Sequence, residues 1–157
     1  MEKKTNVMRI LDRFGVQYEM HDYTDGNVIA GMDVARYLGQ DPAAVFKTLV
    51  AVGKSGAHYV FVIPVCRELD LKKAARSVGE KSIEMIKSRE LLPLTGYVHG
   101  GCSPIGMKKR FVTVFDQSAE GQAHVLFSGG MIGKQVELAL SDLARVLPFT
   151  LCDLTVS

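Results

Sequence analysis

Two consecutive apolar runs joined by a glycine-bounded turn constrain the fold of this chain more than any other feature. Residues 48–52 and 58–65 are rich in β-branched and aromatic side chains, a composition typical of buried strands. Residues 53–56, Gly-Lys-Ser-Gly, separate the two runs and have the composition of a turn. The sequence therefore predicts a β-hairpin whose two strands are buried.

Helices and further strands surround this hairpin. Thr5, Asp41 and Asp70 each precede a helical pattern and carry side chains that cap helix N-termini. The first helix is expected to turn four apolar residues inward, namely Val7, Ile10, Leu11 and Phe14. Further strands are predicted at residues 16–20, 82–85, 111–115, 124–127, 134–140 and 149–156. Because these elements follow no regular strand–helix–strand repeat, the pattern favours an α+β fold over a Rossmann fold.

The length and composition indicate one globular domain. The chain has 157 residues, with 47% apolar and 23% charged residues, which excludes a disordered chain and a collagen-like fibre. No linker or internal repeat interrupts residues 1–157, so they are expected to form a single domain. No apolar run approaches the ~20 residues of a membrane span, and the start of the chain has no apolar signal core, so neither membrane insertion nor export is expected. Three widely spaced cysteines suit a reducing cytoplasm.

The net charge of +2 is spread unevenly along the chain. Residues 67–110 carry ten basic against five acidic side chains, whereas residues 1–66 are balanced and residues 111–157 carry two basic against five acidic. A basic stretch of this kind fits a polyanionic partner, and it also fits a solvated surface on which charges cluster by chance.

The residues of common catalytic and metal sites do not occur at recognisable spacing. The four histidines, His21, His58, His99 and His124, show no ligand spacing with one another or with a cysteine, so no metal and no cofactor is expected. Cys102 lies in the glycine-rich sequence Gly-Cys-Ser-Pro. It is either a nucleophile or a small side chain tolerated in a turn.

Lys47 and two glycine-rich segments are the remaining candidates for a site. Lys47 begins an apolar strand, where a lysine either contacts a substrate or extends its ammonium group to the strand edge. Residues 100–106 and 128–133 supply either turns or backbone amides that approach a ligand. Residues 106–110 place three cations after a glycine, as in a loop that contacts an anion or a solvated charge run.

Five segments in order carry a family resemblance: residues 45–49, 69–73, 95–109, 128–130 and 136–139. The specific part is the string G-Y-x-x-G-G-x-S-P-x-G-x-K-K within residues 95–109. Together they resemble the YbaK/EbsC family, the free-standing aminoacyl-tRNA deacylases that edit mischarged tRNA(Pro). The chain is also similar to the editing domain inserted in bacterial prolyl-tRNA synthetases. The resemblance extends from about residue 5 to about residue 147.

This resemblance implies a mixed, mainly antiparallel sheet or barrel flanked by helices. It implies hydrolysis of Cys-tRNA(Pro) in trans, with the acceptor end of the tRNA as the bound part and prolyl-tRNA synthetase as a partner. In this family the cysteinyl thiol is thought to attack its own ester carbonyl, and the protein supplies positioning. No catalytic cysteine, histidine or metal is then needed.

The resemblance also implies which residues form the site. Lys47, Gly101 and Ser103 are expected to act on the reacting ester. The substrate-binding residues are expected to be Tyr23, Ala30, Thr48, Gly100, Pro104, Gly106, Ser128, Gly129, Gly130 and Gln135. Lys108, Lys109 and Arg110 are expected to contact the tRNA backbone. Two positions depart from relatives: Gln135 replaces an acidic residue, and Ala30 replaces a phenylalanine beside the aminoacyl pocket.

Three alternatives remain open at this point. The same fold can hydrolyse Ala-tRNA(Pro) or another small aminoacyl-tRNA, in which case an enzyme-positioned water must attack. It can also be a tRNA-binding module without catalysis, although the presence of Lys47 and both glycine segments argues against this. A cysteine hydrolase that uses Cys102 is the third alternative.

Overall fold

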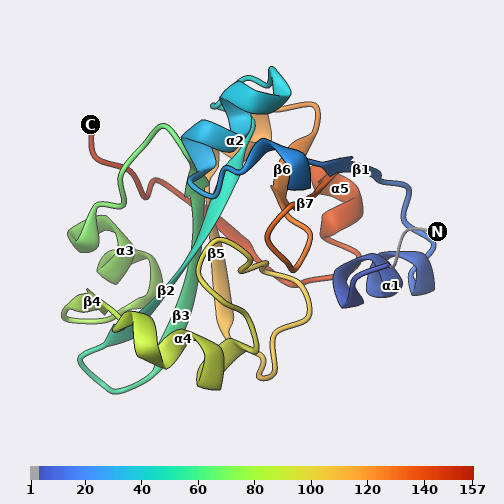
Figure 1. The fold of residues 1–157 in the computed structure, drawn as a ribbon. Coiled ribbons are helices and arrows are strands. Elements are labelled where there is room, and N and C mark those ends of the chain that lie inside the picture. The colour runs from blue at the N-terminus through green and yellow to red at the C-terminus, as the bar shows by residue number, and fades with distance from the viewer. Residues whose placement is uncertain (1–3) are drawn as a thin grey trace.

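The predicted hairpin forms the middle of a five-stranded sheet in the computed structural model, which describes residues 4–157 (Figure 1). Strands β2 (Phe46–Gly53) and β3 (His58–Pro64) pair antiparallel, with Thr48 opposite Val62. Strand β4 (Ile83–Met85) adds to β2 antiparallel, whereas β5 (Val112–Asp116) and β8 (Thr150–Cys152) follow β3 in parallel. The sheet is therefore mixed.

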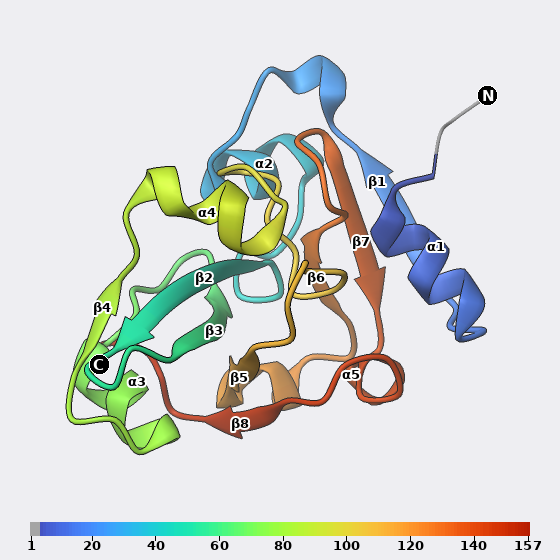
Figure 2. The same ribbon diagram turned by 90° about the horizontal axis from the view of Figure 1, so that it is seen from below.

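A second, three-stranded sheet stands beside the first (Figure 2). It contains β1 (Glu19–Asp22), β7 (Lys134–Leu138) and β6 (Val125–Ser128), in that order and all antiparallel. Just before β2, the Leu126 amide donates to the Ala44 carbonyl at 3.0 Å and connects the two sheets. The α+β fold with mixed sheets is confirmed. Within residues 4–157 the strands form two open sheets, which resolves the alternative between a sheet and a barrel.

The helices begin where capping side chains predict them. Thr5 Oγ1 accepts from the Met8 amide at the start of α1 (Asn6–Arg13), and the Asp70 carboxylate accepts from two amides at the start of α3 (Leu71–Val78). The others are α2 (Gly31–Leu38), α4 (Ser88–Thr95), α5 (Leu140–Leu143) and the 3-10 helices η1 (Thr24–Gly26) and η2 (Gln117–Gly121). Among residues 4–157, no helix combines the length and apolarity that crossing a bilayer requires.

Both faces of the central hairpin are covered, which explains why its strands lack polar alternation. One core contains Phe46, Phe115 and Phe127 and fills the space between the two sheets. A second core contains Phe61 and Ala74 and lies between the opposite face of the hairpin and α3. Figures 1 and 2 both place α3 at the end of the molecule away from α1.

Two local predictions are wrong. The helix expected after Asp41 is a single turn in which the Ala44 amide donates to the Asp41 carbonyl at 2.9 Å, because pairing of Val45 with Leu126 draws the chain into the sheets. Phe14 was expected in the core and is 45% exposed. Since α1 ends at Arg13, Phe14 lies past its last turn, and Met8 takes a buried position on the inner face.

Candidate active site

A cleft of about 300 Å³ lies where the start of β2 meets α2, the loop after α4 and the second sheet. Seven of the predicted site residues line it: Tyr23, Ala30, Lys47, Thr48, Gly100, Ser128 and Gln135. The remaining walls are mostly apolar and include Ile29, Val34, Phe46 and Phe127. The fold therefore brings together segments that are far apart in the sequence.

Among residues 4–157, Lys47 is the only lysine or arginine that lines this cleft, and it is half-buried. In the part of the chain that the structure describes, no Asp or Glu lines the cleft. No hydrogen bond or ion pair joins the Lys47 ammonium group to any residue in 4–157. A partly buried cation without a counter-charge makes the cleft suited to an anionic or strongly dipolar ligand.

Three polar side chains around Lys47 differ in their hydrogen-bond partners and their burial. Thr48 Oγ1 is buried and has no hydrogen-bond partner within residues 4–157, so a bound ligand can supply one. The side-chain amides of Gln135 and Gln40 form two hydrogen bonds with each other, at 2.7 and 3.0 Å. This pair links the segment just after α2 to β7. Tyr23 is buried, and that burial raises the pKa of its hydroxyl group.

The two glycine segments predicted to form the site pack against each other. A Cβ at Gly101 would lie 3.1 Å from the Ile132 nitrogen and 3.2 Å from the Met131 Cα atom. Gly100 has a positive φ of 88°, and a Cβ there would meet Ile29 at 2.5 Å. Close backbone approach therefore favours glycine at position 101, and the positive φ beside the Ile29 side chain favours it at position 100.

The backbone amides of these segments are not equally available. The Gly101 amide donates to the Val98 carbonyl at 3.0 Å, and the Gly129 amide to the Lys134 carbonyl at 2.8 Å. The Gly130 amide donates to Ser128 Oγ at 3.1 Å. In contrast, the amides of Gly100 and Cys102 have no backbone acceptor within residues 4–157. Both of these residues line the cleft, so their amides are candidate donors to a ligand there.

The second half of the glycine loop faces away from Lys47. Ser103 is fully buried, and its hydroxyl accepts from the Ile105 amide at 3.3 Å, as in a turn. Pro104 and Gly106 line a separate cleft of about 280 Å³, together with Lys109 and Arg110.

Lys108, Lys109 and Arg110 are exposed and form no ion pair within residues 4–157. Arg13 from α1 also lines the cleft of Lys109 and Arg110, so three cations surround it.

Sequence reasoning did not select several residues of the sites. His99 lines the Lys47 cleft and is exposed, and its position inside the family string was the available signal. Ile29 and Leu91 line the same cleft but belong to segments with no motif. Arg13 looked like the last turn of an ordinary helix.

Cys102 lies in the cleft but is poorly suited to act as a nucleophile. The residue is 9% exposed, and burial raises the pKa of its thiol to about 12. The reactive species is the thiolate, which is scarce at neutral pH when the pKa is this high.

We therefore expect Cys102→Ser and Cys102→Ala to retain deacylation of an aminoacyl-tRNA within a few-fold of the unmodified protein. The measurement is initial rate, with circular dichroism to verify folding. Loss of activity in both variants while the fold is preserved would establish the cysteine-hydrolase alternative.

Known proteins share both the sequence and the fold of this chain. A family model described as the aminoacyl-tRNA editing domain matches residues 30–146. An Enterococcus faecalis protein named "Putative Cys-tRNA(Pro)/Cys-tRNA(Cys) deacylase EbsC" is 41% identical over 139 residues, which cover 88% of this chain and 85% of the relative. A proline–tRNA ligase of Pelobacter propionicus is 31% identical over 60% of this chain, which corresponds to 16% of the ligase.

A solved structure described as a "putative trans-editing enzyme for prolyl tRNA synthetase" superimposes with a TM-score of 0.82 at 23% identity, covering 99% of this chain and 100% of the other. A hypothetical protein gives a TM-score of 0.88 at 21% identity, over 97% of this chain and 100% of the other. At these identities the likeness shows a shared fold. The family model and the Enterococcus relative establish that the chain belongs to the aminoacyl-tRNA editing domain family, as the resemblance to YbaK/EbsC proteins predicts.

Proposed function

We propose that this protein hydrolyses mischarged Cys-tRNA(Pro) in trans. The observation that carries the proposal is the ammonium group of the half-buried Lys47, which lacks a counter-charge among residues 4–157 in a cleft walled by apolar side chains and glycine backbone. The name of the Enterococcus relative supports this substrate. The similarity to a segment of proline–tRNA ligases supports prolyl-tRNA synthetase as a partner in the cytoplasm. In this proposal, residues 1–157 form one editing domain.

The proposed reaction uses the substrate's own thiol. The cysteinyl sulfur attacks the ester carbonyl, a carbon–sulfur bond forms and the bond from the carbonyl carbon to the ribose oxygen breaks. The thiol proton passes to the departing ribose oxygen, and water later opens the cyclic thioester. Holding two groups in reactive geometry can lower the activation barrier by several kcal/mol, and by up to about 7–11 kcal/mol in favourable cases. The protein then needs to position the substrate and to stabilise developing charge.

The residues of the cleft fit these two tasks. The amides of Gly100 and Cys102 have no backbone acceptor within residues 4–157 and are our proposed donors to the carbonyl oxygen as it becomes negative. Gly101, the residue expected from the sequence, contributes instead by its small size, because its own amide already bonds to Val98. Lys47 is proposed to contact the terminal ribose or phosphate by a charge-assisted hydrogen bond.

One observation favours a second substrate. Thr48 Oγ1 has no partner within residues 4–157, and a hydroxyl group in a cleft can hold an attacking water. Such a water would allow Ala-tRNA(Pro) to be hydrolysed although alanine has no thiol. Ala30 lines the cleft where several relatives carry phenylalanine, so the aminoacyl preference of this protein can differ from theirs.

A deacylation panel tests the proposal. We expect Cys-tRNA(Pro) to be hydrolysed fastest among Cys-, Ala-, Ser- and Pro-tRNA(Pro), with Pro-tRNA(Pro) as the control substrate. Faster hydrolysis of Ala-tRNA(Pro) would favour the water mechanism. Binding of all four without hydrolysis would identify a tRNA-binding module.

The exposed run of Lys108, Lys109 and Arg110 is proposed to contact phosphates of the acceptor end. Phosphate contacts release counterions, so each contact to a single strand adds about −0.7 to the log–log dependence of affinity on salt. Replacing Lys108 and Lys109 with alanine is expected to raise KM for tRNA and to flatten that slope by about 1–1.5 units. Turnover at saturation should change little, because the contacts serve ground state and transition state alike.

The matched control replaces Lys54 and Lys81 with alanine. Both are exposed, neither lines the Lys47 cleft, and the double change removes the same charge. Deacylation over a series of salt concentrations should give the wild-type slope for this control. An unchanged slope for the Lys108 and Lys109 variant would show that the run does not contact the tRNA.

A further inference from the structure

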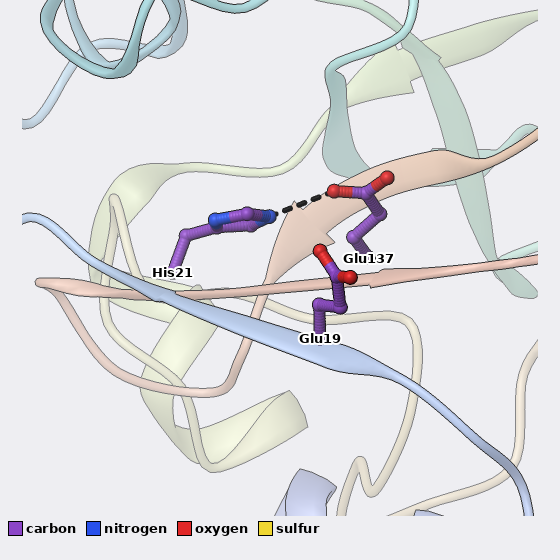
Figure 3. Close-up of side chains that lie close together, drawn as sticks. All are labelled: Glu19, His21 and Glu137. Atoms are coloured by element: carbon purple, nitrogen blue, oxygen red, sulfur yellow. Dashed lines mark hydrogen bonds and ion pairs between the residues drawn. The ribbon is translucent and has the colours of Figure 1, made fainter.

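Three potential metal ligands lie together on one face of the three-stranded sheet. Glu19 of β1 is directly opposite Glu137 of β7, and His21 follows Glu19 by two residues, which places its side chain on the same face. Figure 3 shows the His21 ring and the two carboxyl groups turned toward one another. His21 Nε2 lies 2.7 Å from Glu137 Oε1.

The two carboxylates are an unfavourable pair by themselves. Like charges directly opposite each other in an antiparallel ladder destabilise a sheet. No hydrogen bond or ion pair joins Glu19 to any residue in 4–157. Glu137 has two neutral or cationic neighbours, His21 and His124, but Glu19 has none of its own. A cation between the carboxylates would remove this repulsion.

His124, which lies just before β6, orients the central ligand. Its Nδ1 atom lies 2.9 Å from Glu137 Oε2, the oxygen that faces away from His21. His124 therefore fixes the Glu137 carboxylate through Oε2, and Oε1 is left facing His21. Carboxylates that bind metals are commonly fixed by hydrogen bonds of this kind.

The geometry and the surroundings both suit a divalent cation. One ligand atom from each of Glu19, His21 and Glu137 lies within 4.8 Å of the other two. Zinc binds such ligands at ~2.0–2.2 Å, so occupancy of the site requires these side chains to rotate around the ion. A neighbouring cleft of about 580 Å³ is lined by Glu19, Glu137 and His124, and no lysine or arginine of the described residues 4–157 lines it. Two further acids there, Asp12 and Asp142, already pair with Lys4 and Arg145.

We propose that Glu19, His21 and Glu137 bind one zinc ion, with His124 as the residue that positions Glu137. A nitrogen and two carboxylate oxygens are ligands that zinc accepts, and three protein ligands leave one tetrahedral position for water. The ion would join β1 to β7 and so fasten the N-terminal strand to the second sheet. It lies outside the proposed reaction, in which no step uses a metal.

Zinc titration of the untagged protein tests the proposal. Cys66 is exposed and would bind zinc, so the titration is made in a Cys66→Ser background. We expect about one zinc ion per chain by isothermal titration calorimetry and a higher melting temperature with zinc. Glu19→Gln and His21→Gln should each weaken binding by at least about tenfold and abolish the zinc-dependent rise in melting temperature.

Glu84→Gln is the matched control, because Glu84 is an exposed acid on another edge strand, β4. Circular dichroism without zinc verifies that each variant folds. The proposal is overturned by absence of stoichiometric binding, or by equal affinity in the wild type and Glu19→Gln. Either result leaves the deacylation proposal intact, since the tRNA panel is read independently.

Discussion

Replacing Lys47 with alanine is expected to lower the rate of aminoacyl-tRNA deacylation by about ten- to a hundredfold while the protein stays folded. A hydrogen bond that involves a charged group contributes about 1.5–3 kcal/mol, and each ~1.4 kcal/mol of barrier corresponds to a factor of ten in rate. The ammonium group has no partner to lose within residues 4–157, so its removal leaves no orphaned carboxylate behind. The effect should therefore fall on activity and not on stability.

The comparison needs two further variants. Lys47→Met keeps the apolar stem of the side chain and removes only the charge, so it should lose as much activity as Lys47→Ala. Lys54→Ala removes a charge from an exposed position at the other end of the same hairpin and should leave deacylation unchanged. A folded Lys47→Ala protein with near wild-type kcat/KM would remove Lys47 from the site and with it the main support for the proposed function.

Elements specified by neighbouring residues could be predicted from the sequence. The β2–β3 hairpin depends on its own turn, and α1 and α3 depend on the caps Thr5 and Asp70, so each appears where the pattern indicates. The helix expected after Asp41 fails because its residues form hydrogen bonds with β6, which lies about 80 residues further along the chain. Pairing with a distant segment is invisible to local pattern.

The site residues divide in the same way, into those that local sequence identifies and those whose role depends on distant segments. Lys47 and the two glycine segments could be singled out from residue type and family motif. Of these segments, Gly100, Cys102 and Ser128 line the Lys47 cleft, whereas Pro104 and Gly106 line a separate one. The sequence could not show that the Gly101 amide is used in a turn, because that depends on the path of the loop through Val98. His21 and Glu137 are 116 residues apart, so rules of ligand spacing gave no indication that they meet.

Gly101→Ala is expected to lower kcat/KM by about tenfold. The added Cβ would lie 3.1–3.3 Å from backbone atoms of Met131 and Ile132, which cannot rotate away as a side chain can. Overpacking of this kind costs about 1–3 kcal/mol of stability. The loop then moves away from residues 131–132 and carries the amides of Gly100 and Cys102 with it. Contacts of 3.1–3.3 Å are relieved by a shift of a few tenths of an ångström. Because a displacement of about 1 Å in a positioning group can cost about a hundredfold in rate, this smaller shift is expected to cost about tenfold.

Gly121→Ala separates crowding from the general effect of replacing glycine. Neither glycine has a positive φ, but a Cβ at Gly121 meets nothing within 4 Å. Gly121→Ala should therefore keep wild-type activity and raise the free energy of unfolding by about 0.4–1 kcal/mol, since alanine restricts the unfolded chain. Urea unfolding and deacylation kinetics on both variants give the two quantities. If Gly101→Ala is as active as Gly121→Ala, close packing of the two glycine segments does not position the catalytic amides, and the donors must be sought elsewhere in the cleft.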